Sequence, residues 1–145
     1  MVGALESAQD GSSWGAALSD GWHVDARVFP SAPDAVGWLV GAGPARVLAH
    51  DAVVRQLGDV GLVMVKVTTS DMAAATATLR DAAADGLSWV GVLGEQLALA
   101  DVSLVGGKQI LDSTGSGGQP LAGVKAAAWA LWSARTTPAE LSAIF

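Results

Sequence analysis

Between residues 22 and 93, short apolar runs alternate with segments that carry helix start and stop signals, and this alternation constrains the fold most. The runs at 45–49, 62–67 and 87–93 are short and rich in branched side chains, which is typical of strands covered by helices. The run at 22–29 alternates apolar and polar residues, as a half-buried strand does. This order predicts an α/β domain with a mostly parallel sheet flanked by helices.

Helix capping signals lie between these runs. Ser31 can cap backbone N–H groups and Pro33 suits a first turn, so a helix is predicted from there to about residue 40. Asp51 is a good cap for a short helix over 52–57. A further cap precedes the alanine-rich segment 72–84, which is predicted to be helical.

The chain after residue 93 departs from this alternation. Residues 97–105 and 108–111 flank a Gly-Gly dipeptide that suits a tight turn, so an antiparallel hairpin is predicted at the edge of the sheet. An apolar helix over 121–134 follows, and Thr137-Pro138 predicts the start of a separate last helix.

Residues 1–21 are rich in Gly, Ser, Ala and Asp and show little periodicity, so they are predicted to form a flexible N-terminal arm. A single α/β domain then covers residues 22–145. A ferredoxin-like α+β fold is the alternative, and it follows if residues 52–57 continue the strand before them instead of forming a helix.

The composition argues against several classes of function. The chain has no cysteine and only two histidines, so neither a metal nor another cofactor is expected. Its eight basic residues are scattered singly and its net charge is -6, which argues against nucleic acid as a partner. No apolar stretch is long enough to cross a bilayer and no secretion signal is visible, so no membrane partner and a cytoplasmic location are expected.

The low charge of the chain predicts a covered surface. Only 15% of the residues are charged and the mean hydropathy is +0.42, whereas ordinary domains carry about 25% charged residues. We therefore expect a non-enzymatic subunit that forms a homo-oligomer or binds a permanent protein partner, with Trp129, Trp132 and Phe145 at the interface. Alternatively the chain is monomeric, since many of its apolar residues are alanines that tolerate exposure.

A ligand site is predicted where parallel strands end. In open parallel sheets, ligands bind beyond the carboxyl ends of the strands. That rule selects His50, Asp51, Thr69, Ser70 and Glu95. A histidine near carboxylates can act as a general base, although capping alone also explains most of these residues.

The glycine-rich segment before the apolar helix is a second part of this prediction. Backbone N–H groups around Ser113, Gly115 and Gly117 can hold a phosphate or carboxylate, but such a loop is also an ordinary flexible connection. Together these residues predict a domain that binds an organic acid or a phosphate ester as the alternative function. They do not assign a catalytic residue.

Residues 90–105, VGVLGEQLALADVSLV, form a segment that is similar to the glycine-containing signature of the lactate-utilisation (LUD) domains. The resemblance implies a three-layer α/β fold of the sugar-isomerase and CoA-transferase type in a metabolic subunit that serves organic-acid oxidation. Leu93 stands where the family has threonine, and the family's second glycine before Ser103 is absent.

Overall fold

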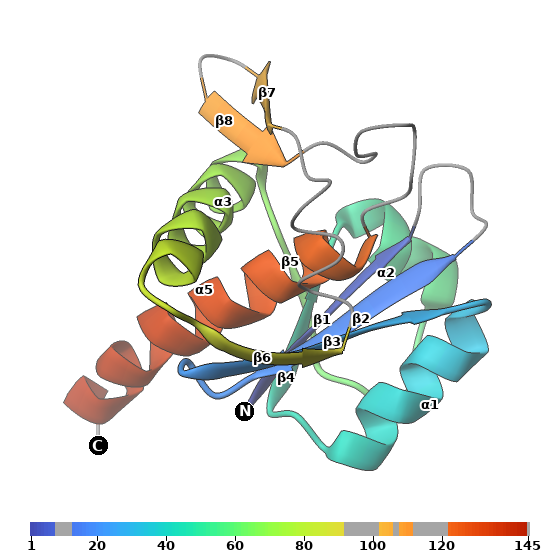
Figure 1. The fold of residues 1–145 in the computed structure, drawn as a ribbon. Helices are drawn as coiled ribbons and strands as arrows, with labels where there is room; N and C mark the ends of the chain where they lie inside the picture. The colour runs from blue at the N-terminus through green and yellow to red at the C-terminus, as the bar shows by residue number, and fades with distance from the viewer. Residues whose placement is uncertain (8–12, 92–101, 106–107, 112–121, 145) are drawn as a thin grey trace.

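The computed structural model describes residues 1–7, 13–91, 102–105, 108–111 and 122–144 (Figure 1). Its centre is a six-stranded sheet in the order β5-β4-β1-β2-β3-β6. The strands of this sheet are β1 (Val2–Ser7), β2 (Trp14–Ser19), β3 (His23–Phe29), β4 (Arg46–Ala49), β5 (Met64–Lys66) and β6 (Ser88–Gly91). Among the described residues, four helices flank the sheet: α1 (Ala32–Ala42), α2 (Asp51–Leu57), α3 (Thr69–Ala84) and α5 (Ala122–Ile144).

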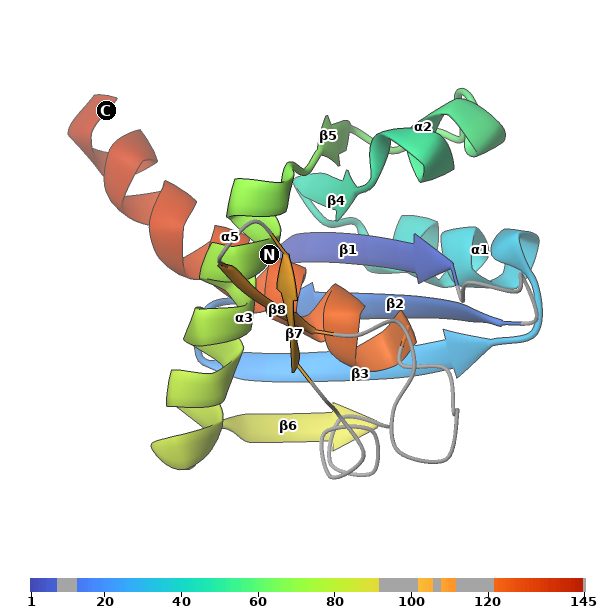
Figure 2. The same cartoon turned by 90° about the horizontal axis from the view of Figure 1, so that it is seen from above.

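Helices cover both faces of the sheet, which confirms the α/β class. Helices α3 and α5 lie on one face and α1 lies on the other (Figures 1 and 2). Along β1, Val2 and Ala4 belong to the core beneath α3 and α5, whereas Leu5 belongs to the core beneath α1 and α2. Because successive side chains of a strand point to opposite faces, β1 contributes residues to both cores.

The N-terminal residues correct the prediction of a flexible arm. Strands β1 and β2 lie within 1–21 and occupy the middle of the sheet, where they pair antiparallel from Val2↔Ser19 to Ser7↔Trp14. Every residue of β2 is buried. Their alanines, glycine and serine are small because helices cover both faces, so a composition that suggested a mobile arm belongs to a closely packed centre.

The short helix α2 decides between the two predicted folds. Residues Asp51–Leu57 are helical and do not continue β4, so the ferredoxin-like alternative is wrong. The predicted caps of α1 and α3 are present: Ser31 accepts a hydrogen bond from the Asp34 N–H, and Thr68 and Asp71 form a reciprocal capping box.

Three predicted elements differ from the structure. Residues 62–67 were expected to form a strand covered on both faces, but β5 spans only Met64–Lys66 at an edge of the sheet and is largely exposed. The hairpin strands β7 (Val102–Val105) and β8 (Lys108–Leu111) do pair antiparallel, but they form a separate two-stranded sheet. One continuous helix, α5, replaces the two helices predicted near the C-terminus.

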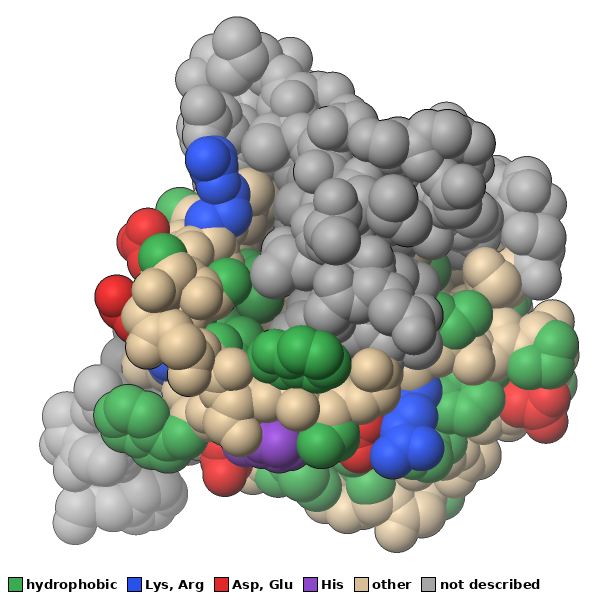
Figure 3. Space-filling model, in the orientation of Figure 1, with side chains coloured by type: hydrophobic (Ala, Val, Ile, Leu, Met, Phe, Trp, Pro, Cys, Tyr) green, Lys and Arg blue, Asp and Glu red, His purple; other side chains and the backbone are tan. Residues whose placement is uncertain are grey.

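Charged side chains are thinly spread over the described surface. On the face shown in Figure 3, lysine and arginine side chains lie in separate places and form no single basic patch. Within the described ranges, no helix is both long and apolar enough to cross a bilayer.

Candidate functional site

Five strands of the sheet run in one direction and end at the same edge. β4 is parallel to β1 and to β5, and β6 is parallel to β3. Because β2 pairs antiparallel with both β1 and β3, these two strands also share a direction. Glu6 lies at the carboxyl end of β1, and His50 directly follows β4. The topology therefore brings these two side chains to one edge.

Helix α5 places a lysine over the same edge. Glu6 pairs in register with Gly15 of β2, and a Cβ atom at Gly15 would collide with the backbone of Ala122 and Gly123. The first turn of α5 can approach the sheet this closely because position 15 has no side chain. Lys125 is the fourth residue of α5 and is buried, so a cation lies at this end of the core.

Glu6 is the most unusual side chain of this edge. It is only 7% exposed, and its Oε2 atom has no hydrogen-bond partner among the described residues. Burial raises the pKa of Glu6 to about 7, although Lys125 and the backbone N–H of Ser7 act to lower it. A carboxyl group with that pKa exchanges protons readily near neutral pH.

His50 faces this carboxyl group. Its Nε2 atom lies 3.8 Å from Oε2 of Glu6, and its ring meets the Trp129 ring edge to face at a centroid distance of 4.9 Å. Burial, together with the charge of Lys125, lowers the pKa of His50. The imidazole is therefore neutral at pH 7. Its side chain is 34% exposed, so His50 contacts solvent while it faces the buried carboxyl group.

The other predicted residues of this edge have structural roles or are not placed. Asp51 begins α2, and it is His50, not Asp51, that occupies the cap position. The Asp51 carboxylate accepts a hydrogen bond from Lys66, which lowers its pKa, and pairs with Arg55. Thr69 and Ser70 open α3, and Thr68 provides its cap. Glu95, Ser113, Gly115 and Gly117 lie outside the described residues, as does most of the segment similar to LUD domains.

The aromatic residues predicted for an interface lie in different settings. Trp129 is 2% exposed and packs in the core beneath α5, so its indole serves the core of its own chain. Trp132 is partly buried against the same core. Phe145 lies outside the described residues.

Sequence reasoning missed Glu6 and Lys125. Glu6 lies in the segment predicted to be a flexible arm, although it follows four apolar or small residues that suit a strand. Lys125 was the clearer signal, because it is the only charged residue between 122 and 134 in an otherwise apolar helix. A lone charge in such a helix is expected either to reach solvent or to face a partner group.

No group of three or more His, Asp or Glu side chains in the described part of the chain is arranged to hold a metal ion. Comparison with known protein families, with curated proteins and with solved structures found no match to the chain. The chemistry of the edge formed by Glu6, His50 and Lys125, here called the carboxyl-edge site, therefore carries the functional argument.

Proposed function

We propose that the chain binds a small organic acid or phosphate ester at the carboxyl-edge site and takes up a proton on Glu6 as it does so. The observation that carries this proposal is the buried Oε2 atom of Glu6, which has no hydrogen-bond partner among the described residues. A buried polar atom without a partner is costly, and a bound molecule relieves that cost when it supplies the missing hydrogen bond.

The charges around Glu6 favour an anion over a cation. Lys125 is a buried cation, and the start of the 23-residue helix α5 adds its own positive potential. An anionic oxygen near Lys125 would repel an ionised Glu6 but would accept a hydrogen bond from a protonated one. Binding therefore favours the protonated form of Glu6.

The experiment measures binding of L-lactate, succinate and glycerol 3-phosphate by calorimetry between pH 5.5 and 9. At least one probe is expected to bind, with an affinity that is constant below about pH 6 and falls roughly tenfold per unit well above the Glu6 pKa of about 7. Glu6→Gln should retain binding and lose this pH dependence, since glutamine cannot ionise.

Lys125→Met should abolish binding. Its matched control is Lys66→Met, which removes an exposed lysine at the same edge of the sheet and should leave the affinity within about twofold. The proposal fails if none of the three probes binds, or if the two lysine substitutions have equal effects.

Self-association is a second candidate function, and an apolar groove favours it. The groove has a volume of about 470 Å³ and is lined by Val36, Gly37 and Val40 of α1 together with Leu57 and Val60, with no charged residue among its lining. Gly37 and Gly41 lie four residues apart on α1, and a Cβ atom added at either position would meet no neighbouring atom within 4 Å. A second copy of α1 can therefore approach this face closely.

Light scattering tests this second candidate. The wild-type chain is expected to have the mass of a dimer, and Val40→Asp is expected to give a monomer because it places a charge in the apolar groove. Val28→Asp is the control, since Val28 is an exposed valine on β3. A monomeric wild-type chain at millimolar concentration would exclude self-association.

A further inference from the structure

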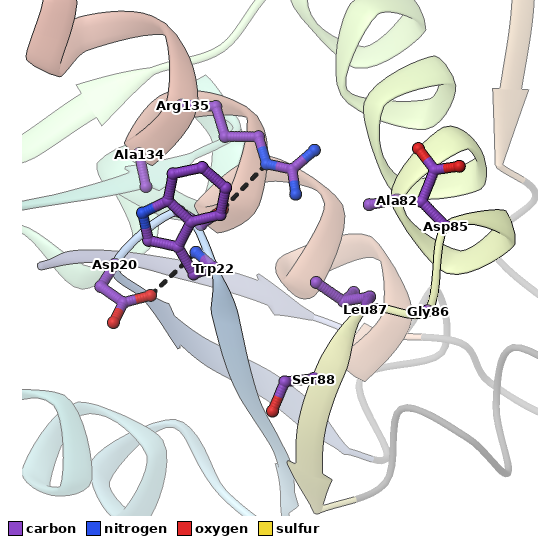
Figure 4. Close-up of a pocket in the computed structure, with 10 residues that line it drawn as sticks. Asp20, Trp22, Ala82, Asp85, Gly86, Leu87, Ser88, Ala134 and Arg135 are labelled. Atoms are coloured by element: carbon purple, nitrogen blue, oxygen red, sulfur yellow. Dashed lines mark hydrogen bonds between the residues drawn. The ribbon is translucent and has the colours of Figure 1, made fainter.

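A cleft lies at the opposite end of the sheet from the carboxyl-edge site. Its volume is about 680 Å³, and Figure 4 shows the side chains around it. The turn before β3, the last turn of α3, the start of β6 and the middle of α5 form its walls. Leu87, Ala82 and Ala134 supply apolar surface within it.

Three charged residues, Asp20, Asp85 and Arg135, line this cleft, and no ion pair joins Arg135 to either carboxylate. The Arg135 Nε donates a hydrogen bond of 2.9 Å to the Gly21 carbonyl, which leaves the two terminal nitrogens of the guanidinium group for another partner. Asp85 caps the end of α3 through its backbone, and no ion pair joins its carboxylate to Arg135. In Figure 4 these two side chains project from different helices, α5 and the end of α3, and no hydrogen bond joins them.

Trp22 adds an exposed aromatic surface. Its side chain lines the cleft at 79% exposure, while the Arg135 guanidinium lies 6.0 Å from its ring centroid. The turn that carries Trp22 is held in place, because Asp20 accepts hydrogen bonds from the N–H groups of Trp22 and His23. An exposed indole on a fixed turn is a common feature of binding surfaces.

We infer that this cleft binds a zwitterionic α-amino acid with an aromatic or large apolar side chain. The carboxylate of the ligand pairs with the free edge of the Arg135 guanidinium, and its ammonium group pairs with Asp85. Its side chain lies on Trp22 and Leu87. A ligand with both charges pairs with Arg135 and Asp85 at once, whereas a simple anion or cation leaves one of these two side chains without a partner.

This inference does not depend on the proposed function of the carboxyl-edge site, since the two sites share no residue. L-Phenylalanine is the probe, and the indole N–H resonance of Trp22, assigned with Trp22→Phe, reports its binding. Two analogues each lack one charge: L-phenylalaninamide has no carboxylate, and N-acetyl-L-phenylalanine has no ammonium group. Both are expected to bind at least about tenfold more weakly than L-phenylalanine.

Substitutions assign the two charges to their walls. Arg135→Gln should lower the affinity for L-phenylalanine at least about tenfold, so that L-phenylalanine no longer binds more tightly than L-phenylalaninamide. With Asp85→Asn, L-phenylalanine should no longer bind more tightly than N-acetyl-L-phenylalanine. The matched controls are Arg55→Gln and Asp81→Asn, two exposed residues outside the cleft, which should leave the affinity within about twofold.

The analogue series keeps the inference testable if a variant fails to fold, because it uses the wild-type chain. Equal binding of L-phenylalanine and both analogues would overturn the inference. An unchanged Trp22 resonance up to 50 mM L-phenylalanine, roughly the limit of a useful small-ligand affinity, would also overturn it.

Discussion

The two ends of the sheet hold carboxyl groups that differ in almost every physical respect. Glu6, at the carboxyl end of β1, is buried and has an oxygen atom without a partner in the described structure. Asp20, at the other end, is exposed and accepts hydrogen bonds from two backbone N–H groups. Burial raises the pKa of Glu6 to about 7, while these backbone hydrogen bonds lower the pKa of Asp20.

This difference follows from solvation rather than from the identity of the acid. An exposed carboxylate keeps its water and gains N–H donors, so its charged form is favoured. A buried carboxylate loses its water, and neither the nearby Lys125 nor one backbone N–H restores what was lost. One end of the molecule is thus suited to proton exchange, and the other to binding by fixed charges.

The largest expected effect is on the free energy of unfolding, and it compares a buried tryptophan, Trp129, with an exposed one, Trp22. Trp129→Ala should lower the free energy of unfolding by about 4 kcal/mol, because it leaves a large cavity under α5. Trp22→Ala should change it by less than about 1 kcal/mol, since that indole is exposed and gives up only its contact with Arg135. Urea unfolding measures both, and similar losses would contradict the burial of Trp129.

The next effect concerns pH and Glu6. The folded chain holds the Glu6 proton more tightly than the unfolded chain, so stability present below pH 4.5 is lost as the pH rises through the folded pKa of about 7. The shift corresponds to about 3 kcal/mol. Glutamine cannot ionise, so the free energy of unfolding of Glu6→Gln should not show this loss. Its advantage over the wild type should therefore grow as the pH rises from 5 to 8 and approach this amount at pH 8.

Asp20→Asn is the control for Glu6→Gln, and its effect has the opposite sign. Because the folded chain lowers the pKa of Asp20, the stability that its carboxylate contributes is present above pH 3.8 and lost as the pH falls through the folded value. The advantage of the wild type over Asp20→Asn should therefore shrink in acid. Unfolding curves with the same pH dependence for both pairs would contradict the contrast between the two ends.

A smaller effect tests how α5 closes the carboxyl-edge site. Gly15→Ala should destabilise the fold by about 2 kcal/mol, because its methyl group would collide with the backbone of Ala122 and Gly123. Gly37→Ala is the matched control, and at a dilution where the chain is monomeric it should stabilise the fold by about 0.5 kcal/mol, since its helical position has open space around it within the chain. Thermal unfolding measures both, and equal effects would show that α5 does not approach β2 so closely.

Much of the fold could be predicted because its signals are local. The capping hydroxyl of Ser31, the capping box of Thr68 and Asp71, and the antiparallel pairing of β7 with β8 all depend on residues close together in the chain. The strands that were missed, β1 and β2, contain small residues whose role depends on helices far away in the sequence. Their composition alone could not distinguish a buried centre from a mobile arm.

Only one of the three residues of the carboxyl-edge site could be predicted. His50 was selected because residues after parallel strands gather at one edge of a sheet. Glu6 and Lys125 are separated by more than a hundred residues, and Lys125 influences Glu6 only because α5 packs on the sheet at Gly15. The reason that Glu6 has an unusual pKa is its loss of water, and no sequence pattern records that loss.

The sequence by itself determined the α/β class and the caps that begin α1 and α3, because turns, caps and side-chain periods act over a few residues. Tertiary structure alone decided that the N-terminal strands form the centre of the sheet and that an imidazole faces a buried carboxyl group at its edge, under the influence of a lysine of α5. Burial depends on what the whole chain places around a residue, so the chemistry of Glu6 arises only in the folded protein.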